Sequence, residues 1–272
     1  MSNILKSAFY MVYYPASFVW RKLDRTGSWS ETRWWIDHLP SAMFTSATYA
    51  SYAGWIQNQG MFSTLFSIYL EKENPNVLDF GCGMGSLAPV SSFFVRKGGK
   101  FLGIDTDEKS IAACRATYGD LKNCEFYLTK DRNAWYKQTD NRGTSEGIDW
   151  PVKNGTQDMI TAMSVFTHLQ EPDAHAYLNK IYETLAKDGR AIISFLVVRD
   201  YVNPNPTFHF NHPLTPGWFT SNPGCPEAAI GVTQEALVKF LSPKFKILRQ
   251  LEGSITGGRH PMHQDMLVLQ KI

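Results

Sequence analysis

Three glycines and a carboxylate form the clearest candidate for a binding site in this sequence. Residues 76–87 read NVLDFGCGMGSL, so Gly81, Gly83 and Gly85 follow directly on a short apolar run. A glycine-rich turn between a strand and a helix lets the backbone approach a ligand, and the helix N-terminus presents free N–H groups. Asp105 ends the next apolar run, where a carboxylate can accept hydrogen bonds from both hydroxyls of a ribose. These residues predict a ligand that contains a nucleoside.

Two kinds of nucleoside ligand fit a loop of this type. The stretch GMGSLA, residues 83–88, matches the GxGxxA form of the dinucleotide-binding fingerprint, which would suit a nicotinamide-dependent oxidoreductase. That fingerprint is weak by itself, because short glycine patterns arise by chance in many chains. Asp79 stands near the end of the first apolar run, two residues before the first glycine, and counts against the oxidoreductase.

The elements that would position these residues alternate along the chain. Apolar runs predict strands at 76–80, 100–105, 124–128, 158–165 and 190–198, and the stretches between them predict helices at 86–99, 107–121 and 171–189. This alternation is typical of an α/β protein with a parallel sheet and helices on both faces. Two further strands, 245–251 and 265–270, are joined by a Gly-rich segment too short for a crossover helix. We therefore expect the last pair to be antiparallel.

Two regions fall outside this alternation. Residues 1–70 hold five of the eight tryptophans and predict an N-terminal helical and aromatic cap, followed by one domain over residues 71–272. The segment 201–228 is rich in Pro, Asn and aromatic residues. We expect it to lack regular structure and to act as a lid inserted in the domain, because long ordered loops usually cover a site.

Four motifs in order resemble those of class I S-adenosylmethionine-dependent methyltransferases. Asp79-x-Gly81-x-Gly83-x-Gly85 resembles the first motif of that family, and LGID, residues 102–105, resembles the second. QDMITAMSVFTHL, residues 157–169, resembles the fourth strand with its turn, and LAKDGRAIISF, residues 185–195, resembles the fifth. The resemblance implies a Rossmann-like fold with a seven-stranded, mostly parallel sheet. It also implies S-adenosylmethionine as the cofactor.

The resemblance also implies a set of cofactor-binding residues: Asp79, Gly81, Cys82, Gly83, Gly85, Asp105, Thr106, Asp131 and Ser164. Asp131 stands for the acid that the family often has after the third strand, although an ungapped reading puts Lys130 there. Ser164 follows the fourth strand, where it could equally cap a helix. His168, in the next turn, is the candidate catalytic base, since imidazole titrates near neutral pH. A histidine there could also serve only to shape the turn.

Charge and motif content indicate the kind of acceptor. The net charge is +2, so no basic face for nucleic acid is expected. The Asn-Pro-Pro-Tyr type of tetrapeptide, which the family uses for amide and base nitrogens, is absent after the fourth strand, where SVFT stands. We expect O-methylation of a small molecule or glycan hydroxyl. A non-catalytic partner subunit with this fold is the other alternative, but it would usually show an eroded glycine loop.

Cysteines, histidines and the N-terminus indicate the setting of the protein. The four cysteines show neither CxxC spacing nor a pairing pattern, which predicts reduced thiols in a cytoplasmic protein. The histidine pairs HFNH, residues 209–212, and HPMH, residues 260–263, fall on no plausible helix beside acidic ligands, so we predict no metal. The aromatic run 7–20 is too short to span a bilayer. It predicts a packed N-terminal extension or a weak peripheral membrane contact.

Overall fold

The computed structural model describes residues 52–129, 150–199, 208–258 and 263–272. The chain divides after Ser51 into two units, and the fold below is that of the second, residues 52–272. Of the expected cap over residues 1–70, only residues 52–70 lie within the described residues, and they contain the helix α4 (Tyr52–Tyr69). No helix in the described ranges is both long enough and apolar enough to cross a membrane.

The first five strands form the parallel part of the sheet, in the order β3-β2-β1-β4-β5. They are β1 (Asn76–Phe80), β2 (Lys100–Asp105), β3 (Cys124–Leu128), β4 (Gln157–Ala162) and β5 (Leu185–Val198). The expected strands and their parallel pairing are confirmed. Because the strands are parallel, their carboxyl ends meet at one edge of the sheet, which is where the glycine loop leaves β1.

Two antiparallel strands complete the seven-stranded part of the sheet. β9 (Phe245–Leu251) pairs with β10 (Asp265–Lys271), and β10 pairs with β5. The predicted antiparallel final pair is confirmed. The order β3-β2-β1-β4-β5-β10-β9 is therefore the seven-stranded sheet that the sequence predicts.

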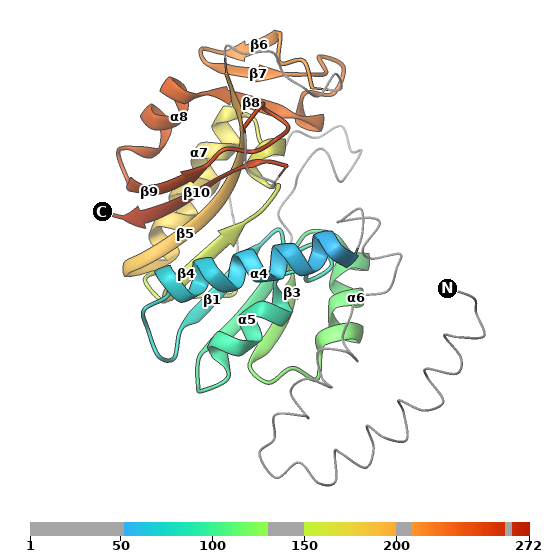
Figure 1. Cartoon of the computed structure of the whole chain (residues 1–272), viewed down its shortest axis with the longest axis vertical. Helices are drawn as coiled ribbons and strands as arrows, with labels where there is room; N and C mark the ends of the chain where they lie inside the picture. The colour runs from blue at the N-terminus through green and yellow to red at the C-terminus, as the bar shows by residue number, and fades with distance from the viewer. Residues whose placement is uncertain (1–51, 130–149, 200–207, 259–262) are drawn as a thin grey trace, which may run out of the picture. The chain divides into compact units, whose positions relative to one another are not determined.

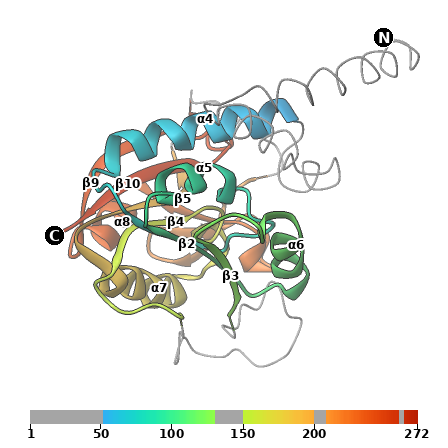
Figure 2. The ribbon, with the colours of Figure 1, turned by 90° about the horizontal axis from the view of Figure 1, so that it is seen from below.

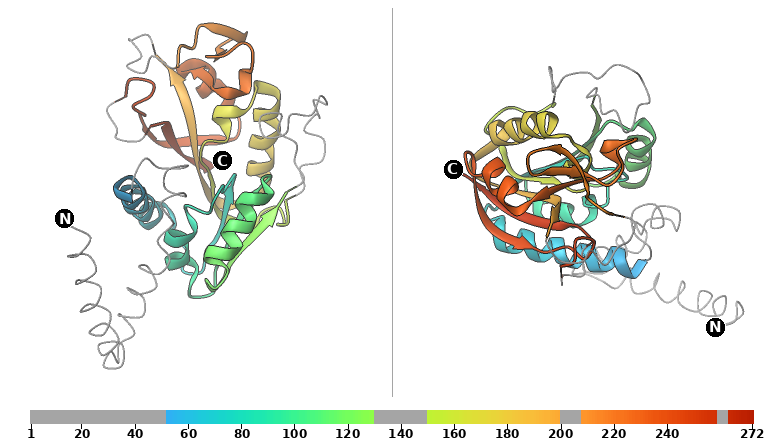
Figure 3. Two further views of the ribbon diagram at one scale, coloured as in Figure 1. Left: turned by 90° about the vertical axis from the view of Figure 1, so that its right-hand side faces the viewer. Right: turned by 90° about the horizontal axis from the view of Figure 1, so that it is seen from above.

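Three further strands raise the sheet in the described residues to ten. β8 (Ile230–Thr233) pairs with the last residues of β5, and the hairpin of β6 (His212–Thr215) and β7 (Trp218–Thr220) pairs with β8. Figures 1 and 3 show these strands at the far end of β5, away from β1 to β3.

The strands β6 and β7 correct the expectation that the segment 201–228 lacks regular structure. The physical reason is the turn between them. Pro216 and Gly217 occupy its centre, and Gly217 has a φ of 82°, which suits the third position of a type II turn. The flanking residues Thr215 and Trp218 are good strand formers, so a short hairpin is stable where composition alone suggested a loop.

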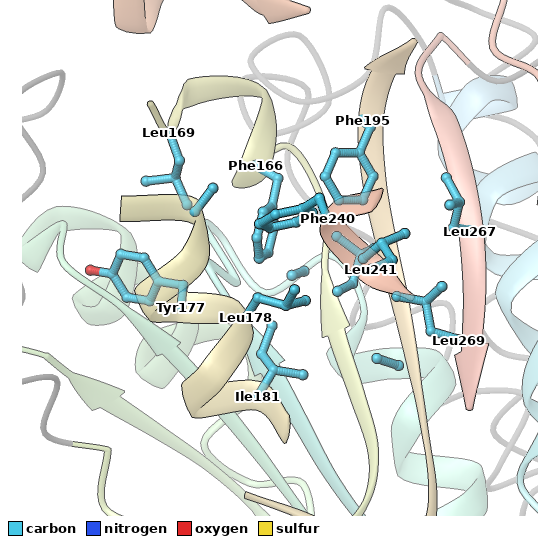
Figure 4. Close-up of a cluster of buried hydrophobic side chains, with 14 of the residues drawn as sticks. Phe166, Leu169, Tyr177, Leu178, Ile181, Phe195, Phe240, Leu241, Leu267 and Leu269 are labelled. Atoms are coloured by element: carbon cyan, nitrogen blue, oxygen red, sulfur yellow. The ribbon is translucent and has the colours of Figure 1, made fainter. Parts of the chain in front are cut away.

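Helices cover both faces of the sheet (Figure 2). Residues of α4, α5 (Ala88–Val95) and α6 (Glu108–Tyr118) share one buried cluster with β1 and β10. The other face is covered by α7 (Glu171–Thr184) and α8 (Gln234–Leu241). In Figure 4, Tyr177, Leu178 and Ile181 of α7 pack beside Phe166 and Phe240 of the same apolar cluster.

Helix α7 is shorter than the sequence suggests. It ends at Thr184 rather than near Gly189, because the backbone of Leu185 is already extended and Leu185 pairs with Gln157 of β4. A Cβ at Gly189 would lie 3.0 Å from the carbonyl oxygen of Gln157. The chain thus passes close to the neighbouring strand, and sheet pairing overrides the helical propensity of this stretch.

Candidate functional site

The glycine loop adopts backbone angles that favour glycine at three alternate positions. Gly81, Gly83 and Gly85 have φ values of 71°, 51° and 76°, a region that other residues rarely adopt. A Cβ at Gly81 would meet the side chain of Val165 at 2.4 Å, and one at Gly85 would meet Cys114 at 3.0 Å. A Cβ at Gly83 would meet nothing within 4 Å. Packing therefore leaves no room for a side chain at Gly81 and little at Gly85, while Gly83 leaves an open surface that a ligand can approach.

Asp105 joins this loop to the end of β2. Its Oδ2 accepts the N–H of Gly83 at 2.8 Å, and its Oδ1 accepts the N–H of Asp107 at 2.9 Å. A carboxylate has about four acceptor positions, so each oxygen can accept a further hydrogen bond. The two backbone bonds hold the carboxylate in one orientation at the sheet edge. This arrangement can bind a pair of neighbouring hydroxyls.

Asp79 lies beneath the loop and is 2% exposed. Thr161 on β4, its register partner, donates its hydroxyl hydrogen to Oδ1 of Asp79 at 2.6 Å. Burial raises the pKa of Asp79 to about 7; the charge of Asp105 adds to this effect, and the Thr161 hydrogen bond opposes it. The carboxyl group is therefore poised between its neutral and charged forms near neutral pH. Thr161 is a site residue that sequence reasoning missed, although a lone threonine within an apolar run was a signal.

Ser164 follows the end of β4 with a φ of 57°, which is uncommon for a residue with a side chain. Its N–H donates to the hydroxyl of Ser194 on β5 at 2.7 Å, and that hydroxyl donates to Oε1 of Gln264 at 2.6 Å. Ser164 is not a helix cap, because Val165 occupies the N-cap position of the next 3₁₀ helix, η1 (Phe166–His168). The strained backbone exposes Ser164 at the same edge as the glycine loop.

His168 is half-buried at the end of η1 and close to a second 3₁₀ helix, η2 (Pro226–Ala228). Its Nδ1 lies 2.7 Å from the carbonyl oxygen of Glu227, and since a carbonyl only accepts, Nδ1 carries the hydrogen. Burial lowers the pKa of His168, against the effect of the Glu227 carbonyl. The lowered pKa favours the neutral ring, whose lone pair is on Nε2 when Nδ1 carries the hydrogen.

One turn of chain connects this imidazole to the glycine loop. The side chain of Val165 packs against Gly81. The backbone carbonyl of Val165 accepts the N–H of His168 at 2.9 Å. Gln170 also donates to Oε1 of Glu227 at 2.5 Å, so η1 and η2 are tied by two contacts. The geometry suits both a base at the site and a residue that shapes the turn.

The remaining predicted residues have supporting positions. Cys82 is buried, and its backbone N–H donates to the carbonyl of Ile104 at 3.0 Å. Its thiol has a pKa well above the usual value, first because of the hydrogen bond with Cys114 and then because of burial. Thr106 is half-buried beside Asp105. Asp131 lies outside the described residues, so its assignment stays a prediction.

The described ranges contain no group of three His, Cys, Asp or Glu side chains placed to hold a metal ion. His209, His212 and His263 fall within these ranges, and His260 lies outside them.

Comparison with known proteins identifies the family. A family model described as a methyltransferase domain matches residues 56–225, which is well over half of the chain. A solved structure from Pyrococcus horikoshii OT3 is 14% identical, covering 80% of this chain and 91% of that one, with a TM-score of 0.54. The cyclase SpnF is 14% identical over 78% of this chain and 80% of its own, with a TM-score of 0.51.

The pyocyanin biosynthetic protein PhzM is 14% identical over 97% of this chain and 71% of its own, also with a TM-score of 0.51. At such identities the likeness shows the fold alone, and the description of SpnF as a cyclase illustrates that one fold carries several activities.

Proposed function

This chain belongs to the methyltransferase domain family, and from that premise we propose that it methylates a hydroxyl group of a small molecule or glycan. S-adenosylmethionine is the methyl donor of this family. The observation that carries the proposal is the carboxylate of Asp105, which accepts one backbone N–H on each oxygen beside the open face of Gly83. The acceptor and the role of each residue are the proposed parts.

The residues at the sheet edge fit an adenosyl cofactor. Asp105 would accept the two ribose hydroxyls, and the open face of Gly83 would admit the cofactor to the backbone. The charged form of Asp79 would place a negative charge beneath the loop, near the methionine end. When bound, S-adenosylmethionine supplies a methyl group on a positively charged sulfur, so the acceptor must present a lone pair in line with the carbon–sulfur bond.

His168 is the proposed general base. With the cofactor bound, Nε2 of the imidazole would take the hydroxyl proton as the oxygen gains the methyl group; the carbon–sulfur bond would break, its electron pair would stay on sulfur, and S-adenosylhomocysteine would leave. The hydrogen bond from Nδ1–H to the carbonyl of Glu227 then stabilises the imidazolium. The lowered pKa of His168 favours the neutral ring, which supports this role, and a positioned base contributes about 10²–10⁴-fold.

Oxygen is the proposed acceptor atom for two reasons. The turn after β4 reads SVFT, without the Asn-Pro-Pro-Tyr type tetrapeptide that suits amide and base nitrogens. The net charge of +2 gives no support for a nucleic-acid substrate.

Calorimetry on the full chain tests this function. S-adenosylmethionine and S-adenosylhomocysteine should bind at micromolar concentrations, and NAD should give no heat. Binding of NAD without binding of either adenosyl compound would replace the proposal with an oxidoreductase. Methyl transfer is then measured with a library of hydroxyl-bearing compounds and a set of nitrogen acceptors. If the cofactor binds and a nitrogen acceptor is methylated but no hydroxyl is, the proposed O-methylation is wrong.

A further inference from the structure

A second recess lies at the far end of β5, away from the glycine loop. It is a cavity of about 220 Å³ lined by Val198, Arg199, residues 208–211 and Thr256. Its volume exceeds the roughly 150 Å³ of an engineered cavity that binds benzene, but falls below the roughly 300–1,000 Å³ of sites for whole drug-sized ligands. The cavity is therefore the right size for one small ring system, single or fused, of a larger molecule.

The one charged residue among those that line the cavity, Arg199, is paired with a buried carboxylate. Asp265 is fully buried and accepts hydrogen bonds from the N–H groups of Val197 and Gly253 and from the hydroxyl of Thr256. It also forms a salt bridge with the guanidinium of Arg199, whose side chain is 10% exposed. Since Asp265 neutralises Arg199 in place, the lining offers no net positive charge for an anionic ligand.

The walls of the cavity are aromatic. The rings of Phe208 and Phe210 stack with centroids 6.2 Å apart and planes at 20°. Phe210 rests against Gly231 of β8, where a Cβ would come within 2.7 Å of the ring. The absence of a side chain at Gly231 therefore fixes the position of one wall. Flat aromatic walls favour a flat partner.

The polar groups of the cavity are too few for a sugar. Thr256 is already engaged with Asp265 and with Arg199, which leaves His209 and Asn211 as the exposed polar side chains of the lining. A monosaccharide carries several hydroxyls, and each one that is buried without a partner weakens binding. An uncharged aromatic ring with one or two polar substituents matches the lining better.

The cavity lies on the same face of the sheet as Ser164. Along β5, Ile193, Phe195 and Val197 belong to the apolar cluster with α7, so Ser194 and Val198 point to the opposite face. Ser194 accepts the N–H of Ser164, and Val198 stands four residues further along. At strand spacing this is roughly 13 Å from the edge where the cofactor is proposed to bind.

We propose that this cavity, defined by Val198, Arg199, residues 208–211 and Thr256, binds an uncharged aromatic ring of the methyl acceptor, remote from the oxygen that is methylated. The proposal rests on the proposed function and narrows its acceptor to an elongated molecule with an aromatic group. The aromatic group docks against the stacked rings of Phe208 and Phe210, while the reacting hydroxyl reaches the edge near Ser164.

Binding of three probes to the full chain, saturated with S-adenosylhomocysteine, tests the proposal. The probes are 2-naphthol, 2-naphthoate, which has the same ring system with a negative charge, and methyl β-glucoside. Calorimetry or ligand-observed NMR should show 2-naphthol binding at least tenfold more tightly than the other two. No binding of 2-naphthol, or tighter binding of 2-naphthoate or the glucoside, would overturn the proposal.

Variants locate the bound ring. Phe210→Ala removes one wall of the cavity and should lower the affinity for 2-naphthol by about three- to tenfold, in line with the strength of ring–ring contacts. Gly231→Ala should weaken it too, because the added methyl group displaces Phe210 into the cavity. Gly224→Ala is the matched control, since Gly224 is exposed and a Cβ there would meet only Asn222 at 3.4 Å.

Equal 2-naphthol affinity in the wild type and Phe210→Ala would place the ring elsewhere and overturn the proposal. S-adenosylhomocysteine should bind every variant as it binds the wild type. If it fails to bind the wild type, the proposed function fails; if it binds and 2-naphthol does not, only the aromatic acceptor fails.

Discussion

The glycine loop and the far end of β5 are two polar regions on one sheet, built in different ways. At the loop, the backbone N–H of Gly83 is fixed by the carboxylate of Asp105, 22 residues away in the chain. At the end of β5, the buried charges of Arg199 and Asp265 meet across 66 residues. The first arrangement leaves acceptor positions open for a ligand, whereas the second satisfies its own charges. The loop can therefore bind a ligand, whereas the buried pair of Arg199 and Asp265 stabilises the fold.

The largest effect should come from breaking the buried pair. Asp265→Asn leaves the guanidinium of Arg199 without its buried counter-charge and should lower the free energy of unfolding by about 3–5 kcal/mol. Glu252 does not replace it, because its carboxylate lies 3.9 Å from Arg199 and is 54% exposed. Urea denaturation measures the loss.

The double variant Arg199→Met with Asp265→Asn is the control, and it should recover at least half of that stability because no unpaired charge remains buried. A single variant as stable as the wild type would show that the pair does not hold this region together.

The second effect concerns the loop and should appear in binding rather than in stability. Asp105→Ala removes the two proposed hydrogen bonds to the ribose hydroxyls. It should therefore weaken binding of S-adenosylmethionine by about 2–4 kcal/mol, which is at least tenfold in affinity. Calorimetry on the folded variant measures it.

Asp107→Ala is the matched control at the same turn. Asp107 caps α6 by accepting the N–H and hydroxyl of Ser110, so its loss should cost about 1 kcal/mol of stability and leave cofactor affinity nearly unchanged. If both variants bind the cofactor like the wild type, the ribose lies elsewhere.

The difference in construction explains how much the sequence could predict. The loop, its strands and the helix that begins near residue 107 depend on residues within one or two elements, so glycine spacing and apolar runs are enough to place them. The final strand pair was also local, because the short connection allowed only an antiparallel arrangement.

The rest depended on contacts between distant residues. Thr161 reaches Asp79 across 82 positions, and only the register of β1 with β4 reveals the pair. Composition alone does not predict the strands β6 and β7, because the Pro, Asn and Gly residues around their turn are also typical of a loop. The end of α7 was misplaced because pairing with β4, not local propensity, decides where β5 begins.

A third prediction uses the titration of Asp79. Its pKa is raised to about 7, so the ligand-free fold favours the neutral acid. The stability that this group contributes is complete below about pH 4 and is lost as the pH rises through about 7. The positive cofactor should instead favour the charged form, and its affinity should increase with pH.

Between pH 6 and pH 8 the charged fraction of a group with a pKa of about 7 rises by about tenfold. Affinity for S-adenosylmethionine, measured by calorimetry, should follow that rise in the wild type. In Asp79→Asn it should be flat over the same range. An equal rise in both proteins would assign the dependence to another group.

The smallest effect should come from the residue that lies between the two regions. Ser194 accepts the N–H of Ser164 and donates to Gln264, which is the neighbour of Asp265. Ser194→Ala leaves a donor and an acceptor unmatched at the sheet edge, where water replaces part of the loss, so it should cost only about 1 kcal/mol in urea denaturation. Ser67→Ala is the control, because its exposed hydroxyl donates to the carbonyl of Ser63 within α4, and it should change stability very little.

Ser194→Ala should also weaken binding of the cofactor, because Ser194 holds the strained backbone of Ser164. If the two regions are independent, the stability lost in the double variant of Ser194→Ala with Asp265→Asn should equal the sum of the two single losses. A double variant that departs from that sum by more than about 0.5 kcal/mol would show instead that the loop edge and the buried pair are coupled through β5.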